Sequence, residues 1–467
     1  MTRRSIGLRW AALIPGVLLY FLPVPGLSGQ QRHLLAVFAT TIISLAAQPV
    51  PMAVSVVVAM TMLALTGTLP GAQVLTGFSN TTVWLIFTAF LFAHTLTVTG
   101  LGRRVAYVFI ERFGRSALTL AYSMTGANLV VAPFVPSDTA RGGGLILPIT
   151  RSLAQIFGSE PGPTANRLGA FLTLSAFHAN YTVSAMFLTS MAANALIAEF
   201  ARKIAHVNLT WGNWALAASL PGLLTLALAP YVIYRLHPPE VRDTQAARVH
   251  AAGELAQMGP MSRREIVLSV IFLAVMAGWV TSPWHGVNNT FVALAGISAI
   301  LLCRVVTWDE LLAEGRAWDA LIWFGPLIMM SDALNESGVI RILSSTLFQT
   351  MHGWSWPVAA VALVVSYLYL HYAFASLTAH VMALYPSFLA AGVAAGAPPL
   401  AMALALAFFS SLDAAMTHYG TGSAPVFFGA GYVTQGMWWR LGLLLSLMNL
   451  VIWLGIGPLW WKALGMW

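Results

Sequence analysis

Long apolar runs separated by short polar segments form the main pattern of this chain. A run of about 20 apolar residues can cross a bilayer as a helix, and backbone groups in lipid must be hydrogen-bonded internally. We therefore expect an all-α polytopic membrane protein with about eleven transmembrane helices. The predicted spans are 9–26, 33–48, 51–67, 81–101, 165–200, 212–236, 263–281, 288–304, 317–335, 398–430 and 438–461.

Two further apolar segments, 117–153 and 356–390, each have a polar centre. The first contains "VVAPFVPSDTARGGGLILPIT", in which Asp138 and Arg141 precede three consecutive glycines. Irregular backbone is tolerated at membrane depth where protein surrounds it. We therefore interpret both segments as re-entrant helical hairpins that enter and leave on one side. The exposed backbone amides at such a tip can bind an anion.

The chain repeats itself with a shift of 238 or 239 residues, and several matches in order at a nearly constant shift indicate an internal repeat. The matched pairs are Ser137 with Ser376, Thr139 with Thr378, Arg141 with His380, Thr182 with Thr421, Ser184 with Ser423, Leu96 with Leu334, Gly100 with Gly338 and Arg103 with Arg341. An odd number of crossings inverts the second copy. This is the plan of secondary transporters, whose sites lie at discontinuous helices near the midplane.

The repeat and the polar segments divide the chain into four parts. We predict an N-terminal span at 1–32, a first repeat at 33–236, a cytoplasmic linker at 237–262 and a second repeat at 263–467.

Composition agrees with a membrane protein. Of 467 residues, 58% are hydrophobic and 8% are charged, whereas soluble domains carry roughly 25% charged residues. A single cysteine, Cys303, excludes an intrachain disulfide and a cysteine metal cluster. The net charge of +8 does not indicate a nucleic-acid partner, because the arginines are scattered over loops. The partner that we expect is the lipid bilayer.

The arginines also predict the orientation, because cytoplasmic loops carry an excess of positive charge. We expect a multi-pass inner (plasma) membrane protein of bacterial type, with the N-terminus inside and the C-terminus outside. This orientation places inside Arg3, Arg4, Arg9, Arg103, Arg104, Arg112, Arg115, Arg167, Arg242, Arg248, Arg263, Arg264, Arg304, Arg316 and Arg440, and leaves outside mainly Arg32, Arg202, Lys203, Arg341 and Lys462.

The hairpin "PSDTARGGGLILPI" resembles the serine–asparagine–threonine signature of the divalent anion–sodium symporter family. The segments "YTVSAMFLTSMAANALIA", "HYAFASLTAHVMALYPSFLA" and "MTHYGTGSAPVFFGAGYV" resemble its branch of 2-oxoglutarate/malate translocators and citrate/succinate and tartrate/succinate exchangers. The resemblance extends from about residue 30 to the end. It implies a homodimer with a scaffold domain, a moving transport domain and di- or tricarboxylate substrates.

The same resemblance implies that two hairpin tips and two broken spans hold the substrate. The fifth and tenth spans are expected to break around Asn180–Ser184 and Tyr419–Ser423. The predicted substrate-binding residues are Ser137, Asp138, Thr139, Arg141, Asn180, Thr182, Ser184, Ser376, Thr378, His380, Tyr419, Thr421 and Ser423.

Two departures from the family pattern bear on the coupling ion. Asp138 and Leu377 stand where sodium-coupled members have asparagine, and Leu377 offers no side-chain oxygen to a cation. A bound sodium ion near Asp138 and Asn180 is kept as an alternative, and no other cofactor is expected. Because Arg141 and His380 can supply fixed positive charge instead, we predict sodium-independent exchange, and the resemblance implies an elevator-type mechanism. Sodium- or proton-coupled symport is the alternative.

Simpler interpretations exist for the same residues. The serines and threonines at the tips can cap helices, and Asp138 can pair with Arg141 three residues on. His94 and Asp332 correspond in the repeat and are expected to make structural contacts, whereas Asp413 and His418 are further site candidates. A membrane-embedded enzyme is the remote alternative from another class. We expect no enzyme, because the chain has no HExxH, Walker or serine-histidine-aspartate arrangement.

Overall fold

The computed structural model describes residues 10–374 and 376–467, which are helical with no β-strand. The predicted all-α polytopic class is confirmed. Residues 1–9 lie outside the described part, and with them Arg3, Arg4 and Arg9 of the predicted cytoplasmic set. Among the described residues, six helical segments are long and apolar enough to cross a membrane: Thr81–Thr99, Ala117–Phe134, Trp211–Leu236, Trp356–Ala373, Leu377–Ala394 and Gln435–Ala463.

The chain forms two compact units, each built from three stretches of sequence. Unit 1 consists of Met1–Phe87, Ala195–Leu209 and Glu314–Leu406, and unit 2 consists of Thr88–Asn194, Thr210–Ala313 and Ala407–Trp467. Both predicted repeats contribute segments to each unit.

Many helices start where the sequence provides a side-chain cap. Ser28, Ser116, Ser262 and Thr307 each accept a hydrogen bond from the backbone N–H three residues on, and the residue there returns the bond as a capping box. Such caps satisfy the N–H groups that the first turn of a helix leaves unpaired.

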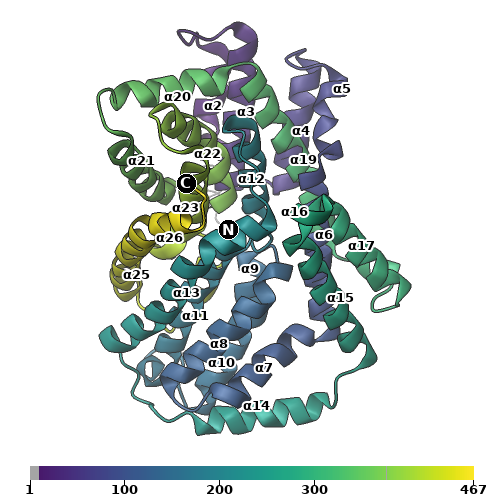
Figure 1. Ribbon diagram of the computed structural model, residues 1–467, viewed down its shortest axis with the longest axis vertical. Coiled ribbons are helices and arrows are strands. Elements are labelled where there is room, and N and C mark those ends of the chain that lie inside the picture. Colours follow the sequence, from purple (N-terminus) through teal and green to yellow (C-terminus); the bar gives the residue numbers. More distant parts are fainter. Residues whose placement is uncertain (1–9, 375) are drawn as a thin grey trace. The chain divides into compact units, whose positions relative to one another are not determined.

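In unit 1, the N-terminal helices pack with α19 (Gly315–Glu336) (Figure 1). Gly77 lies against Gly325 of α19, and a Cβ built on Gly77 would meet the Gly325 carbonyl oxygen at 1.8 Å. Only glycine permits this approach. The first helices are α2 (Ile14–Phe21), α3 (Gly29–Ala47), α4 (Met52–Leu65), α5 (Gly71–Val74) and the 3₁₀ turn η1 (Thr76–Ser79).

Unit 1 also holds the second hairpin. Its arms are α21 (Trp356–Leu370) and α22 (Leu377–Ala394), joined through the 3₁₀ turn η5 (His371–Ala373). Helix α20 (Val339–Thr350) packs on α22. None of the predicted transmembrane spans corresponds to α20 or to its counterpart in the first repeat, α7 (Leu101–Phe113), because both helices are amphipathic and short.

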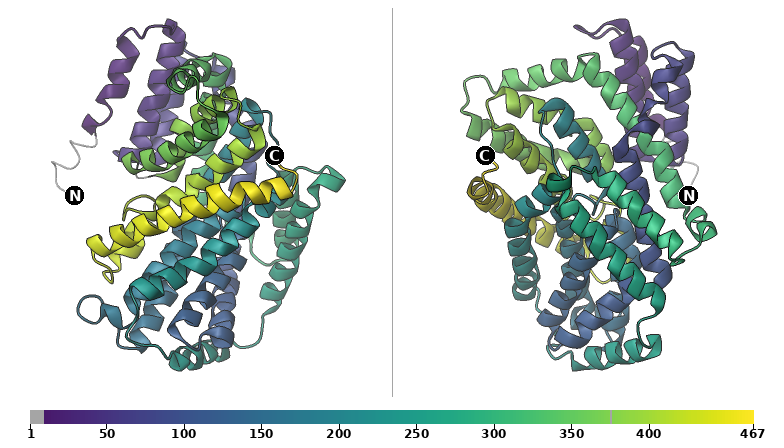
Figure 2. Two further views of the ribbon diagram at one scale, coloured as in Figure 1. Left: turned by 60° about the vertical axis from the view of Figure 1, so that its left-hand side comes forward. Right: turned by 45° about the vertical axis from the view of Figure 1, so that its right-hand side comes forward.

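Unit 2 packs the first hairpin against α11 (Gly169–Met186) and α13 (Trp211–Leu236). The hairpin consists of α8 (Ala117–Val131), η2 (Ala132–Phe134), α9 (Asp138–Arg141), a π-helical turn (Gly142–Ile146) and α10 (Leu147–Ile156). The C-terminal helices α25 (Gln435–Leu450) and α26 (Gly457–Ala463), joined by a π-helical turn (Val451–Ile456), lie along α13 (Figure 2). The elements of the two units not yet named are α6 (Thr81–Thr99), η4 (Ala165–Arg167), α12 (Ala192–Ile204), α16 (Ser282–His285), α17 (Asn289–Leu302), α18 (Trp308–Leu312), α23 (Pro399–Leu412), η6 (Asp413–Ala415) and α24 (Ala424–Gly429).

The predicted break of the fifth span is displaced. Asn180–Ser184 lie inside α11, which ends at Met186, and α12 begins at Ala192. Phe187 is extended, with φ −129° and ψ 139°. The prediction placed the break a turn too early, because Ser184 and its neighbours are polar residues that the helix tolerates. The tenth span does break around Tyr419–Ser423, between η6 and α24.

The predicted linker contains a helix, α14 (Gln245–Met258), which packs along α7 (Leu101–Phe113) (Figure 1). Arg103 pairs with Glu254 at 3.4 Å, and the Arg248 side chain donates to the Glu111 carbonyl at 2.5 Å. Polar contacts therefore fasten this helix to the rest of unit 2.

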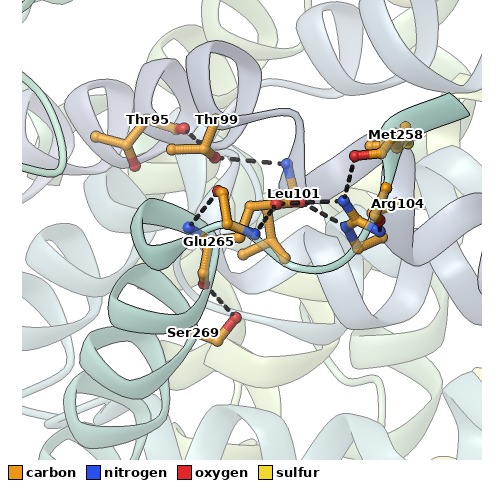
Figure 3. Close-up of polar contacts among 9 residues, drawn as sticks. Thr95, Thr99, Leu101, Arg104, Met258, Glu265 and Ser269 are labelled. Carbon is orange, nitrogen blue, oxygen red and sulfur yellow. Dashed lines mark hydrogen bonds and ion pairs between the residues drawn. The ribbon is translucent and has the colours of Figure 1, made fainter. Parts of the chain in front are cut away.

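A buried ion pair joins α7 to the start of α15 (Arg263–Val280), and the same arginine also bonds to the end of the linker helix. Arg104 donates to Glu265 at 2.5 Å and to the carbonyl oxygens of Gly259 and Met258 at 2.9 and 3.4 Å (Figure 3). Arg104 is 8% exposed and Glu265 is 3% exposed. Breaking one partner of such a pair typically costs about 3–5 kcal/mol, so we infer that this contact stabilises the packing of α7.

Candidate functional site

The two hairpin tips have the same local geometry. Ser137 is extended at φ −144° and ψ 113°, and Ser376 at φ −141° and ψ 122°. The Ser137 hydroxyl accepts from the Ala140 N–H at 3.1 Å, and the Ser376 hydroxyl accepts from the Ala379 N–H at 3.3 Å. Both serines therefore cap the helix that follows them. Each hydroxyl keeps its own proton to donate elsewhere.

The elements that lead into the tips also match. Helices α8 and α21 are both 15 residues long, begin 239 residues apart and each end in a three-residue 3₁₀ turn. Upstream, Gly100 and Gly338 both adopt the left-handed conformation, at φ 77° and 82°, directly before α7 and α20. Glycine suits both positions because it has no Cβ.

Asp138 lies at the first tip and bonds to the broken tenth span. Its carboxylate accepts from Ser423 Oγ at 2.9 Å and from Thr421 Oγ1, and more weakly from Thr139 Oγ1 at 3.3 Å. Asp138 is 7% exposed. Among the described residues it forms no ion pair with Arg141. The pairing considered from the sequence is therefore wrong, because each of the two side chains bonds to other groups.

Arg141 is fully buried, at 1% exposure, so its guanidinium does not extend to the surface. Its Nη1 donates to the carbonyl oxygens of Val135 and Ser190, each at 3.0 Å. Its Nη2 donates to the carbonyl oxygen of Asn180 at 2.9 Å and to the hydroxyl of Ser184 at 2.5 Å. One guanidinium thus joins the hairpin tip to the end of α11 and to the break that follows it.

The candidate residues of the fifth span are all buried in α11. The Asn180 amide donates to the Asp138 carbonyl oxygen at 2.8 Å, which connects α11 to the first tip. Thr182 instead donates to the His178 carbonyl oxygen of its own helix at 2.7 Å. Unit 2 therefore brings Asp138, Arg141, Asn180 and Ser184 together, while the Thr182 hydroxyl bonds locally.

Sequence reasoning missed the residues that close the break after α11. Asn194 donates to the carbonyl oxygens of Ser184 and Phe187 at 2.8 and 2.9 Å, and Ser190 Oγ, with its single proton, lies 2.7 Å from each of the same two oxygens. Broken helices leave carbonyls without helical partners, so these polar side chains replace the missing bonds. The polar residues of the segment "TSMAAN" (189–194) are the signal in the sequence that could have indicated this role.

Thr189 was missed in the same way. Its hydroxyl donates to the Pro133 carbonyl oxygen at 2.6 Å and accepts from the Trp211 indole at 3.0 Å. Trp214 donates to the Ala185 carbonyl oxygen at 2.8 Å. Two indoles of α13 therefore form hydrogen bonds to the broken fifth span.

The candidates of the second tip lie in unit 1. Thr378 is half-buried, whereas His380 is fully buried, and its ring centroid lies 4.2 Å from that of Tyr367 and 4.9 Å from that of His371. His380 therefore lies in an aromatic environment rather than at the surface.

The other candidates differ in their surroundings. Asp413 is fully buried in η6, Tyr419 is half-buried, and His418 Nδ1 accepts from the Trp439 indole at 3.0 Å. In unit 1, Asp332 pairs with Lys203, which also lies 2.8 Å from Glu199. His94 is half-buried in α6.

Comparison with known proteins gives a consistent picture. Residues 5–467 match the family model described as "Sodium:sulfate symporter transmembrane region". The putative malate transporter YflS of Bacillus subtilis (strain 168) is 47% identical over 454 residues, which cover 97% of this chain and 95% of that protein. The chloroplastic dicarboxylate transporter 1 of Arabidopsis thaliana is 41% identical over 461 residues, which cover 98% and 83%.

A solved structure supports the fold. The crystal structure of the Alcanivorax borkumensis YdaH transporter, described as having an unusual topology, aligns with a TM-score of 0.60 and covers 84% of this chain and 87% of that one. The two sequences are 16% identical, so the likeness concerns the fold alone.

Proposed function

Because the chain belongs to the sodium:sulfate symporter transmembrane family, a family of membrane transporters and not of enzymes, we propose that it exchanges one dicarboxylate for another without sodium. The carboxylate cargo is supported by the names of the relatives, a putative malate transporter and a chloroplastic dicarboxylate transporter. The absence of sodium coupling is supported by the contacts of Arg141.

A dicarboxylate that leaves water needs compensating positive charge, because burying an unpaired charge is costly. Sodium can supply that charge through a cage of oxygen ligands, the kind that hard cations use. Here the oxygens of Val135, Asn180, Ser190 and Ser184 all accept from the Arg141 guanidinium. We infer that this fixed cation takes the place of a bound one. This is the single observation that carries the proposal.

Leu377 supports the same conclusion at the second tip. It is 5% exposed and stands beside Ser376, but its side chain has no oxygen for a cation.

Fixed charges have a consequence for the transport cycle. An empty carrier would have to move a buried charge without its partner, which is unfavourable, whereas a loaded carrier would not. The proposed result is obligate exchange rather than net uptake. We further propose an elevator-type movement in a homodimer, with the N-terminus in the cytoplasm and the C-terminus outside.

A competition experiment tests the cargo. Proteoliposomes loaded with malate should take up labelled malate, and unlabelled succinate, 2-oxoglutarate, citrate and tartrate should be compared as competitors. We expect dicarboxylates to compete and inorganic sulfate to compete weakly. Uptake that only sulfate inhibits would contradict a carboxylate cargo.

The tips are tested by removing one hydroxyl from each. Thr139 and Thr378 occupy matching positions after the capping serines, and a hydrogen bond to a charged group is worth about 1.5–3 kcal/mol. Thr139→Ala and Thr378→Ala should each weaken the apparent affinity for malate on the order of tenfold. Unchanged uptake kinetics in both variants would rule out this role.

A further inference from the structure

A cavity of about 510 Å³ lies in unit 2 beside the first hairpin, outside the contacts described above. Its walls come from the π-helical turn with α10 and from α24. Ligand pockets of small molecules span about 300–1,000 Å³, so the cavity has the size of a binding site. It is not fully enclosed, as entry from solution requires.

The polar wall of the cavity comes from α10 alone. Arg151, Ser152 and Gln155 line it, and Arg151 and Gln155 are exposed. Arg151 forms no ion pair with any described residue. Ser152 lies 3.4 Å from His250 Nε2 of the linker helix α14. The cavity therefore presents an unpaired positive charge next to neutral hydrogen-bonding groups.

The apolar wall of the cavity belongs to an element that is continuous with the candidate site. Val426, Gly429 and Ala430 belong to α24 and the residue after it, and α24 starts directly after Ser423, which bonds to Asp138. Gly143 of the π-helical turn also lines the cavity and contacts α24 there, because a Cβ on Gly143 would meet Val426 Cγ1 at 3.1 Å. The cavity thus lies between the two elements that meet at the Asp138 carboxylate.

We propose that this cavity is an entry subsite for carboxylate anions, in which Arg151 captures a substrate carboxylate before it reaches the hairpin tip. The proposal rests on the proposed function for the identity of the anion. Under the proposed orientation, the cavity opens on the cytoplasmic side, where the first hairpin enters.

Charge and position both support an entry role rather than final binding. Arg151 is exposed, so its field attracts anions from solution and is screened by salt. It lies ten residues beyond Arg141 along the hairpin. Arg151 should therefore govern the concentration of anion at the mouth and leave the maximal exchange rate unchanged.

Thiol labelling in detergent tests the subsite independently of transport. Gln155→Cys in a Cys303→Ser background is reacted with an anionic methanethiosulfonate (sulfonatoethyl) and a cationic one (trimethylammonioethyl). Adding Arg151→Gln should lower the anionic-to-cationic rate ratio by about threefold or more, because one nearby charge is lost. The matched control is Arg112→Gln, which removes an exposed arginine on α7 and should leave the ratio unchanged.

An unchanged ratio in the Arg151→Gln protein would overturn the proposal. A thiol at position 155 that neither reagent reaches would also overturn it, because the cavity would then face lipid. These readouts do not depend on carboxylate transport, so a failure of the proposed function is distinguishable as absent malate counterflow in the wild-type protein.

Transport kinetics test whether the subsite lies on the substrate path. Arg151→Gln should raise the apparent KM for malate about three- to tenfold at low ionic strength, with the maximal rate retained and the difference reduced in high salt. Arg112→Gln should behave as wild type. A labelling ratio that falls while the KM stays unchanged would contradict the entry role.

Discussion

At the scale of single residues, Asp138 and Arg141 of the first tip bond to different partners. A spacing of three residues on a helix favours an ion pair. Instead, the carboxylate accepts from Thr421 and Ser423, and the guanidinium bonds to three carbonyl oxygens and Ser184. The carbonyls of a broken helix lack helical partners, and a guanidinium with five donors satisfies several at once.

The hydroxyl of Thr421 provides a test of the contact with Asp138. Thr421→Val keeps the shape of the side chain but removes one charge-assisted bond, which is worth about 1.5–3 kcal/mol. We expect malate exchange to fall on the order of tenfold. The control is Thr125→Val in α8, which removes a buried hydroxyl bonded only to the Ala121 carbonyl oxygen of its own helix at 2.9 Å. Equal losses in both variants would contradict a specific role for Thr421.

Removal of Arg141 should affect stability and exchange together. Arg141→Ala removes four buried hydrogen bonds, and each hydrogen bond to a charged group is worth about 1.5–3 kcal/mol. The unfolding temperature in detergent should fall by several degrees, and malate counterflow should be lost. Arg141→Lys keeps the charge and should retain more exchange than Arg141→Gln, although the two lose the same planar fork. Equal activity of the lysine and glutamine variants would contradict a role for the fixed charge.

At the scale of elements, the sequence predicted both hairpins because a polar centre interrupts each apolar segment. It could not place the break of the fifth span, because polarity alone does not distinguish Asn180, inside a helix, from Ser190, in the break. It also missed α14, because the segment Gln245–Met258 is polar and alanine-rich and shows no strong helical period of apolar residues. The contact of Asp138 with Thr421 joins residues 283 positions apart, and no local pattern predicts such a pair.

The glycines of the π-helical turn provide a matched test. A Cβ on Gly142 would lie 2.8 Å from Asn180 Nδ2 and 2.8 Å from the Phe427 ring, whereas a Cβ on Gly144 would meet nothing within 4 Å. Gly142→Ala should therefore displace the tip and lower malate exchange on the order of tenfold or more, since overpacking costs about 1–3 kcal/mol. Gly144→Ala should keep wild-type exchange and thermal stability. Full activity of the Gly142→Ala protein would contradict the close packing of the turn.

At the scale of the whole molecule, the proposed orientation rests on the distribution of arginines. Val249, in the linker helix α14, is 67% exposed, so a cysteine there reports the side of the membrane. In intact cells, Val249→Cys in a Cys303→Ser background should resist an impermeant maleimide and react only after the cells are opened. Labelling of intact cells would contradict a cytoplasmic linker.

The central claim is that a fixed guanidinium replaces a coupling cation, and counterflow tests it most directly. Purified protein is reconstituted into vesicles that are either empty or loaded with malate, and labelled malate is added in choline or in sodium buffer. We predict rapid uptake into loaded vesicles in both buffers and almost none into empty ones, because an empty carrier would have to move an unpaired buried charge. Strong sodium-driven uptake into empty vesicles would contradict the account and favour symport.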